Sequence, residues 1–423
     1  MKKLNILELF SQDENFKLLT EIVNDNSSTE DVLLKNLNGS HMSILAAHVI
    51  RKTKSNHLFI VENLEKALYF LDDLNHIIPN HQCLLFPSSK RINIGDQNVL
   101  LERIEVLNKL NKKNRISIIT YPEAIREKII SKKDFRKNQI TLSVGDVVDQ
   151  YDLMEKFEDL HFRNSSLVLE PGDYAIRGFI IDIFSYGNEH PFRIVFNDNT
   201  INTISYFKVS DQLSLDIINT INVTPNIESG KNYTDIFSHL NPTTITWINN
   251  SEFAFVKDET TKDSENKLTI QMCKQKIEKY QCIYTGSINN VDHLKTIVFH
   301  SSTQPAFNKN FEILISHLDE HRKMGFQNII TVSSKSQMQR LKKVFENYQH
   351  LVNLELCENS LQSGFLDKDT KILLYTDHQI FERYHQYKSK RIYKTENTIS
   401  IRELTDLKKG DYVAHFDYGI GIF

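Results

Sequence analysis

The sequence predicts an α/β protein of several domains, in which a β-rich segment interrupts a larger α/β unit. Strand patterns alternate with amphipathic helix patterns over residues 1–145 and again over 217–305, as is typical of a layered α/β domain. Residues 146–216, which lie between these two parts, are dense in β-forming residues and short reversals. A length of 423 residues allows roughly two to four domains.

The composition is that of an ordinary globular protein, with 40% hydrophobic and 25% charged residues. A net charge of −3 lacks the strong positive field of a dedicated nucleic-acid binder. The four cysteines form no CxxC pair and no cluster with histidines, so we expect neither a metal site nor disulfides. With no apolar leader and no run long enough to cross a bilayer, the expected location is the cytoplasm, without membrane contact.

The first α/β unit, residues 1–145, begins with amphipathic helical spacing over residues 1–25. Alternating strands and helices follow. Strands are expected at 32–34, 57–61, 83–87 and 116–120, and helices at 44–50, 62–77, 101–110 and from 121 onward, where Pro122 stands near N1. This order builds one α/β layer.

The turn after the first strand stands where a phosphate-binding loop would lie. Such a loop, GxxxxGK[ST], offers backbone amides and a lysine to phosphate and a hydroxyl to magnesium. Gly39, Ser40 and Ser43 supply small residues here, but the turn contains no lysine. We interpret it as a degenerate nucleotide loop and expect no cofactor in this segment.

Other candidate sites are weak. The basic clusters at Lys112, Lys113 and residues 132–137 have few aromatic neighbours on which bases could stack, so we interpret them as solvated faces rather than a DNA site. His293 and His300 belong to no nucleophile motif, and the carboxylates lie in solvated runs. We therefore expect no catalytic residue and no metal ligand.

Residues 167–211 form the stretch around which the chain is organised, and their pattern predicts a β-meander. Gly178, inside the first strand, is interpreted as a bulge or a close backbone approach. Arg177 and Arg193 are expected on neighbouring strands, where two guanidinium groups could form a carboxylate-binding patch for a protein partner. The alternative is that each arginine makes an ordinary surface ion pair.

The pattern returns to α/β character after the meander. Strands are expected at 243–248, 283–285 and 296–299, with a polar loop at 257–267. Residues 306–385 predict a small α/β domain with Gly325 ending one helix and Ser333 or Ser334 capping the next. Residues 386–404 form a polar linker, and 405–423 the first strands of a small barrel.

Three stretches resemble one protein family. Residues 172–178, GDYAIRG, and 181–184, IDIF, resemble the second domain of bacterial transcription-repair coupling factors (Mfd proteins) and the equivalent domain of the excision-repair protein UvrB. Residues 407–423 resemble the start of the coupling factors' RNA-polymerase-interacting domain, and residues 85–124 resemble their first domain. UvrB carries a long aromatic hairpin where residues 88–98 are short and have no aromatic side chain.

The resemblance implies the N-terminal, UvrB-like part of a coupling factor, which recruits the repair protein UvrA to stalled RNA polymerase. It places the UvrA-binding residues at Arg177 and Arg193, with Phe196 as an apolar anchor; the family's second adjacent aromatic is Asn197 here. RNA polymerase would bind through residues 405–423. ATP, magnesium and most DNA contact would belong to a translocase motor that follows this segment, which itself is expected to be non-catalytic.

Two alternatives remain at this point. A UvrB-like ATPase or helicase would act on damaged DNA itself, but it needs the loop lysine and the aromatic hairpin. A purely structural α/β module would match the motifs by chance.

Overall fold

The computed structural model describes residues 5–25, 30–89, 97–112, 114–224, 233–249, 267–286, 294–305, 310–348, 352–381, 412–415 and 419–422. The expected linker at 386–404, Lys113, His293, most of the loop at 257–267 and much of the run at 405–423 lie outside these residues. The chain divides into two compact units. Unit 1 comprises Met1–Arg91, Glu105–Lys128 and Thr234–Ser389, and unit 2 comprises Ile92–Ile104, Ile129–Tyr233 and Lys390–Phe423.

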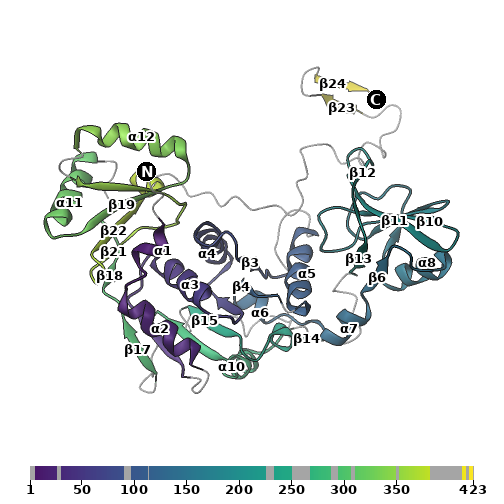
Figure 1. Ribbon diagram of the computed structural model, residues 1–423, viewed down its shortest axis with the longest axis horizontal. Coiled ribbons are helices and arrows are strands. Elements are labelled where there is room, and N and C mark those ends of the chain that lie inside the picture. Colours follow the sequence, from purple (N-terminus) through teal and green to yellow (C-terminus); the bar gives the residue numbers. More distant parts are fainter. Residues whose placement is uncertain are drawn as a thin grey trace. The chain divides into compact units, whose positions relative to one another are not determined.

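The main sheet of unit 1 is parallel and has seven strands in the order β17-β1-β16-β15-β2-β4-β3. Figure 1 labels β3, β4, β15 and β17 of this sheet. Its strands are β1 (Val32–Lys35), β2 (His57–Ile60), β3 (Gln82–Leu85), β4 (Ile116–Thr120), β15 (Ile245–Asn249), β16 (Gln281–Thr285) and β17 (Lys295–Val298). The last three strands follow the meander in sequence, yet β1 lies between two of them and β2 pairs with the third. The sheet is therefore completed only after the chain returns from the inserted segment.

Helices accompany this sheet, as the βα order requires. They are α1 (Ile6–Leu9), α2 (Glu14–Asn24), α3 (His41–Lys52), α4 (Leu64–Ile77), α5 (Gln97–Asn111), α6 (Pro122–Ile125), the 3₁₀-helix η2 (Ile236–His239) and α10 (Ile270–Ile277). Pro122 is at the start of α6, as expected. Helix α3 is buried at nearly every position, which places its N-terminal turn inside unit 1.

A second sheet in unit 1 forms what we call the third lobe, residues 301–381. Its strand order is β18-β21-β22-β19-β20. The elements are β18 (Ser301–Ser302), α11 (Phe311–Lys323), β19 (Gln327–Val332), α12 (Lys335–Phe345), η4 (Glu346–Tyr348), β20 (Leu354–Glu358), β21 (Phe365–Asp367), β22 (Ile372–Thr376) and α14 (Asp377–Ile380). Ser334 caps α12, and Gly325 follows α11 with φ +86°, both as the sequence indicated.

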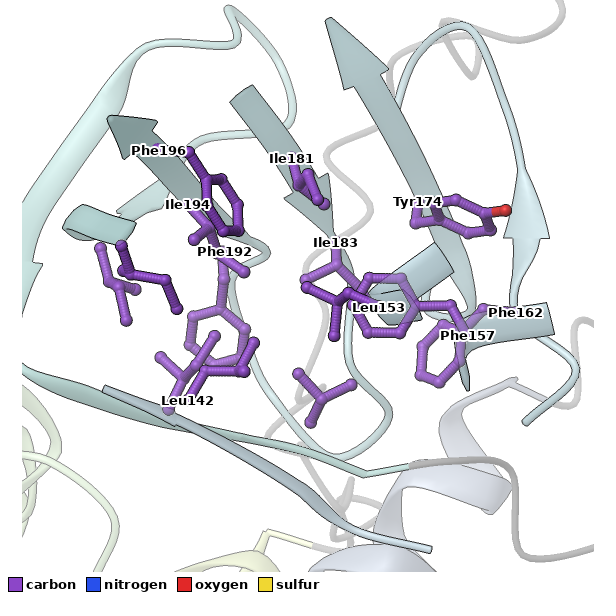
Figure 2. Close-up of a cluster of buried hydrophobic side chains, with 14 residues drawn as sticks. Leu142, Leu153, Phe157, Phe162, Tyr174, Ile181, Ile183, Phe192, Ile194 and Phe196 are labelled. Atoms are coloured by element: carbon purple, nitrogen blue, oxygen red, sulfur yellow. The ribbon is translucent and has the colours of Figure 1, made fainter. Parts of the chain in front are cut away.

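Unit 2 contains a six-stranded sheet of order β12-β11-β10-β9-β8-β7. Its strands are β7 (Arg163–Asn164), β8 (Asp173–Arg177), β9 (Ile180–Ile183), β10 (Phe192–Asn197), β11 (Thr200–Phe207) and β12 (Ser214–Ile218). Helix α8 (Gln150–Asp159) and the antiparallel ribbon of β6 (Ile140–Ser143) and β13 (Thr220–Val223) supply further core side chains. The resulting apolar cluster lines one face of the sheet (Figure 2).

The remaining short elements are β5 (Ile129–Ile130), α7 (Lys132–Lys137), β14 (Tyr233–Thr234) and a hairpin of β23 (Tyr412–His415) with β24 (Gly419–Ile422). The predicted fold class is confirmed: a multidomain α/β chain with a split α/β sheet and an inserted β-rich body.

The interpretation of Gly178 was wrong. Arg177 pairs with Ile180, so Gly178 and Phe179 form the two-residue turn of the β8–β9 hairpin. Gly178 has φ +62°, which glycine adopts readily and which suits the first central position of such a turn. A Cβ at Gly178 would meet nothing within 4 Å, so no backbone approaches it closely.

Candidate docking face of the inserted sheet

A buried carboxylate organises the face of the sheet that turns away from the apolar cluster. Asp182 of β9 is directly opposite Ala175 of β8 and Arg193 of β10. Directly paired residues in antiparallel strands project from the same face. Asp182 is 1% exposed, although it belongs to the outer face, because neighbouring side chains cover it.

Two arginines flank this carboxylate. The Nε and one terminal nitrogen of Arg193 donate to the two oxygens of Asp182 at 2.8 and 2.9 Å, a bidentate pair. The guanidinium of Arg193 also lies 4.7 Å from the centre of the Phe207 ring and donates to the carbonyl of Gln212. Arg177 Nη1 is 3.7 Å from Asp182 Oδ2. We call this set, Arg177, Asp182 and Arg193, the arginine ladder.

The two arginines differ in accessibility. The Arg193 side chain is 17% exposed, and its hydrogen bonds with Asp182 raise the pKa of its guanidinium. The Arg177 side chain is 40% exposed and donates one hydrogen bond to the carbonyl of Ser166. With two cations and one carboxylate, the ladder has one positive charge in excess, and Arg177 is the member that a partner can reach.

This geometry corrects the expected arrangement. Arg177 and Arg193 are not on neighbouring strands, since β9 lies between β8 and β10. Sequence reasoning missed Asp182, the residue that joins them. The signal was available, because Asp182 is the only polar residue among Ile181, Ile183 and their apolar neighbours in the IDIF run.

Phe196 does not lie on this face. It is 4% exposed and belongs to the apolar cluster with Phe192 and Ile194, as Figure 2 shows. The expectation that Phe196 is an apolar anchor is therefore wrong, because strand alternation sends every second residue of β10 into the core. Asn197 ends β10 and is exposed.

Other apolar side chains are exposed near the ladder. Phe179, at the tip of the β8–β9 hairpin, is 62% exposed. Ile217 of β12 is 73% exposed and pairs with Ser205, which in turn pairs with Arg193, so it shares the ladder's face. Strand β12 is an edge strand of its sheet. Phe179 next to the reachable Arg177, with Ile217 exposed on the same face of the sheet, gives this face the composition of a protein-docking surface.

The degenerate nucleotide loop is in unit 1. Gly39 and Ser40 form the turn between β1 and α3, and Ser43 lies in the first turn of α3. Ser40 and Ser43 are buried and make hydrogen bonds within unit 1. These three residues are thus close together, as the sequence pattern required.

Metal-ligand groups and membrane-spanning helices are both absent among the residues that the structure describes. No three histidine, cysteine or acidic side chains there gather as metal ligands. Nor does any helix among those residues have the length and apolarity needed to cross a bilayer. The four cysteines are buried and form no disulfide. Burial raises the pKa of the Cys83, Cys273 and Cys282 thiols to about 12, which disfavours the reactive thiolate.

The inserted body is similar to a known family of domains. Residues 140–228 match the family model described as the UvrB interaction domain. This match covers the ribbon of β6 and β13, helix α8 and the sheet that carries the arginine ladder.

The chain as a whole is similar to transcription-repair-coupling factors, which confirms the resemblance seen in its motifs. It is 21% identical to that of Bacillus subtilis (strain 168), over 99% of this chain and 44% of the relative. It is 20% identical to those of Staphylococcus aureus strains RF122 and Mu50, over 98% of this chain and 43% of each relative. The chain therefore spans less than half the length of these curated relatives.

Proposed function

We propose that this chain is the partner-recruiting part of a transcription-repair coupling factor and that its inserted domain binds UvrA. The observation that carries the proposal is the arginine ladder, which leaves one reachable cation, Arg177, on the outer face of a UvrB interaction domain. The similarity of nearly the whole chain to coupling factors supports the same assignment.

The ladder explains how one arginine can be both fixed and available. Asp182 is buried and accepts two close hydrogen bonds from Arg193. The guanidinium of Arg177 is attracted to the same carboxylate but lies farther from it, at 3.7 Å, so Arg177 remains available to a partner. An acidic group on UvrA can then pair with Arg177 at little cost in side-chain entropy, because the arginine is already positioned. Phe179 replaces Phe196 as the apolar anchor, since it is exposed next to Arg177 in the hairpin turn.

The remaining roles belong to the parent protein. The parent would be an ATP-driven, magnesium-dependent DNA translocase that displaces stalled RNA polymerase in the cytoplasm, with the polymerase bound by the domain that begins at residues 405–423. Nothing in this chain's proposed role requires a cofactor. DNA contact of this segment alone would be weak and salt-screened, given its net charge of −3.

The test is the affinity of the 423-residue chain for purified UvrA, measured by calorimetry. We expect saturable binding, and a loss of at least about tenfold for Arg177→Ala, which corresponds to roughly 1.4 kcal/mol. Arg136→Ala is the matched control, because Arg136 is an exposed arginine on α7 of the same unit. If the unsubstituted chain and the Arg177→Ala variant are both folded and bind UvrA with equal affinity, the ladder is not part of the interface.

A further inference from the structure

The degenerate nucleotide loop touches a segment more than 300 residues later in the chain. The amide of Ser40 donates to the carbonyl of Ser363 at 2.9 Å, and the amide of Ser363 donates back to the hydroxyl of Ser40 at 3.1 Å. Ser363 belongs to the third lobe, in the segment before β21. We call residues 362–364 the plug.

Gly39 shows how closely the plug fits. A Cβ at Gly39 would lie 2.4 Å from the carbonyl oxygen of Gly364 and 3.0 Å from that of Ser363. The φ of Gly39 is +56°, so any other residue would also be strained. Gly39 therefore allows the turn to approach two backbone carbonyls of the plug closely.

A carboxyl group of the same chain also lies at the degenerate loop. Asp73 of α4 accepts a hydrogen bond from the hydroxyl of Ser43 at 2.7 Å and from the amide of Gln362 at 2.8 Å. Ser43 is the residue whose hydroxyl would coordinate magnesium in a working loop. Burial raises the pKa of Asp73 to about 6, and the hydrogen bonds from Ser43, Ser40 and Gln362 oppose that rise.

The plug is equally fixed on its own lobe. The amide of Gly364 donates to the side-chain oxygen of Gln379 at 2.7 Å, and a Cβ at Gly364 would lie 2.2 Å from the carbonyl of Leu374. Next to it, the Phe365 ring stacks on the imidazole of His41 with centroids 4.5 Å apart and planes 4° apart. The contact therefore joins two rigid surfaces.

We propose that the degenerate loop and Asp73 form a socket whose ligand is the plug of the same chain, and that this contact locks the third lobe onto the first α/β sheet. The backbone carbonyl of Ser363 accepts the hydrogen bond of the Ser40 amide, and the carboxyl group of Asp73 accepts that of the Ser43 hydroxyl, where phosphate and magnesium would bind in a working loop. Nucleotide is excluded by occupancy, in addition to the missing lysine. The small third lobe thereby moves with the sheet instead of swinging on a linker.

Hydrogen exchange on the 423-residue chain tests the contact, because the amides of Ser40, Gln362, Ser363 and Gly364 all donate across or beside it. We expect these amides to be protected. Gly39→Ala should speed exchange at residues 362–364 by roughly tenfold or more. Gly178→Ala is the matched control, since its φ of +62° is similar and a Cβ there meets nothing within 4 Å. Unchanged exchange of the plug in folded Gly39→Ala would overturn the proposal.

Two further variants keep the test decisive. If Gly39→Ala does not fold, Asp73→Ala should speed exchange of the Gln362 amide, because it removes the carboxyl oxygen that accepts from this amide; unchanged exchange would contradict the socket. Met42→Lys restores a lysine directly before Ser43. We expect no saturable binding of magnesium-ATP by this variant at millimolar concentration, whereas micromolar binding would show that the missing lysine alone closes the site.

Discussion

Asp182 and Arg193 face each other across β9 and β10 and share two hydrogen bonds of 2.8 and 2.9 Å, although only one of these residues was expected to matter. A bidentate pair whose carboxylate is 1% exposed is a structural element as well as an electrostatic one. The two arginines of the ladder therefore differ: Arg193 pairs closely with the buried carboxylate, whereas Arg177 stays half-exposed.

Arg193→Ala should destabilise unit 2, because it leaves the Asp182 carboxylate buried without its main partner. A loss on the order of 3 kcal/mol is expected for breaking one side of a buried pair. Denaturant unfolding of the variant measures it. The double variant Asp182→Ala with Arg193→Ala should recover part of the loss, since no uncompensated charge remains. If the Arg193→Ala variant unfolds at the same denaturant concentration as the unsubstituted chain, the Asp182–Arg193 pair contributes nothing to stability.

Phe179→Ala and Phe196→Ala should have opposite effects. Phe179 is 62% exposed, so its removal should weaken UvrA binding by several-fold and leave the unfolding transition in place. Phe196 is 4% exposed in the apolar cluster, so its removal should cost roughly 3 kcal/mol of stability by leaving a cavity. Calorimetry with UvrA and a thermal melt separate the two. Normal stability of Phe196→Ala would contradict its place in the core.

The affinity for UvrA should fall with salt, because Arg177 is a half-exposed cation and its ion pair with a partner is screened. A several-fold loss is expected as the ionic strength rises from about 0.05 to 0.5 M. Arg177→Ala should show a flatter dependence. If the affinity for UvrA falls equally with salt in the unsubstituted chain and in this variant, Arg177 makes no ionic contact with UvrA.

Acid should destabilise unit 1 through two buried histidines. Burial lowers the pKa of His41 and of His57 to about 3, so both remain neutral when folded, whereas the unfolded chain takes up protons below about 6.5. Stability is therefore full above pH 6.5 and is lost as the pH falls toward 3. Between pH 7 and 5 each histidine should cost about 2 kcal/mol.

His41→Phe checks this assignment. Both ring nitrogens of His41 are buried and have no hydrogen-bond partner among the residues that the structure describes. The ring packs among phenylalanines, so phenylalanine should fit there and remove one protonation. Between pH 7 and 5 this variant should lose less stability than the unsubstituted chain. His76→Gln, at an exposed position of α4, controls for the loss of a histidine as such. An unchanged pH dependence in His41→Phe would exclude His41 as a source.

Local patterns in the sequence determined the secondary-structure elements and the fold class of this protein. The β8–β11 meander, the Ser334 cap and the degenerate turn at Gly39 follow from residues close together in the chain, because alternation, capping and turn chemistry are short-range effects. The motif match to coupling factors is local in the same sense.

Only the tertiary structure decided which side chains meet. The carboxylate between Arg177 and Arg193 depends on strand order and register, which place β9 between β8 and β10. The burial of Phe196 depends on which face of β10 the apolar cluster covers. The contact of Gly39 with Gly364 joins residues more than 300 positions apart, and no local pattern encodes such a pairing, because it is fixed by how two lobes pack.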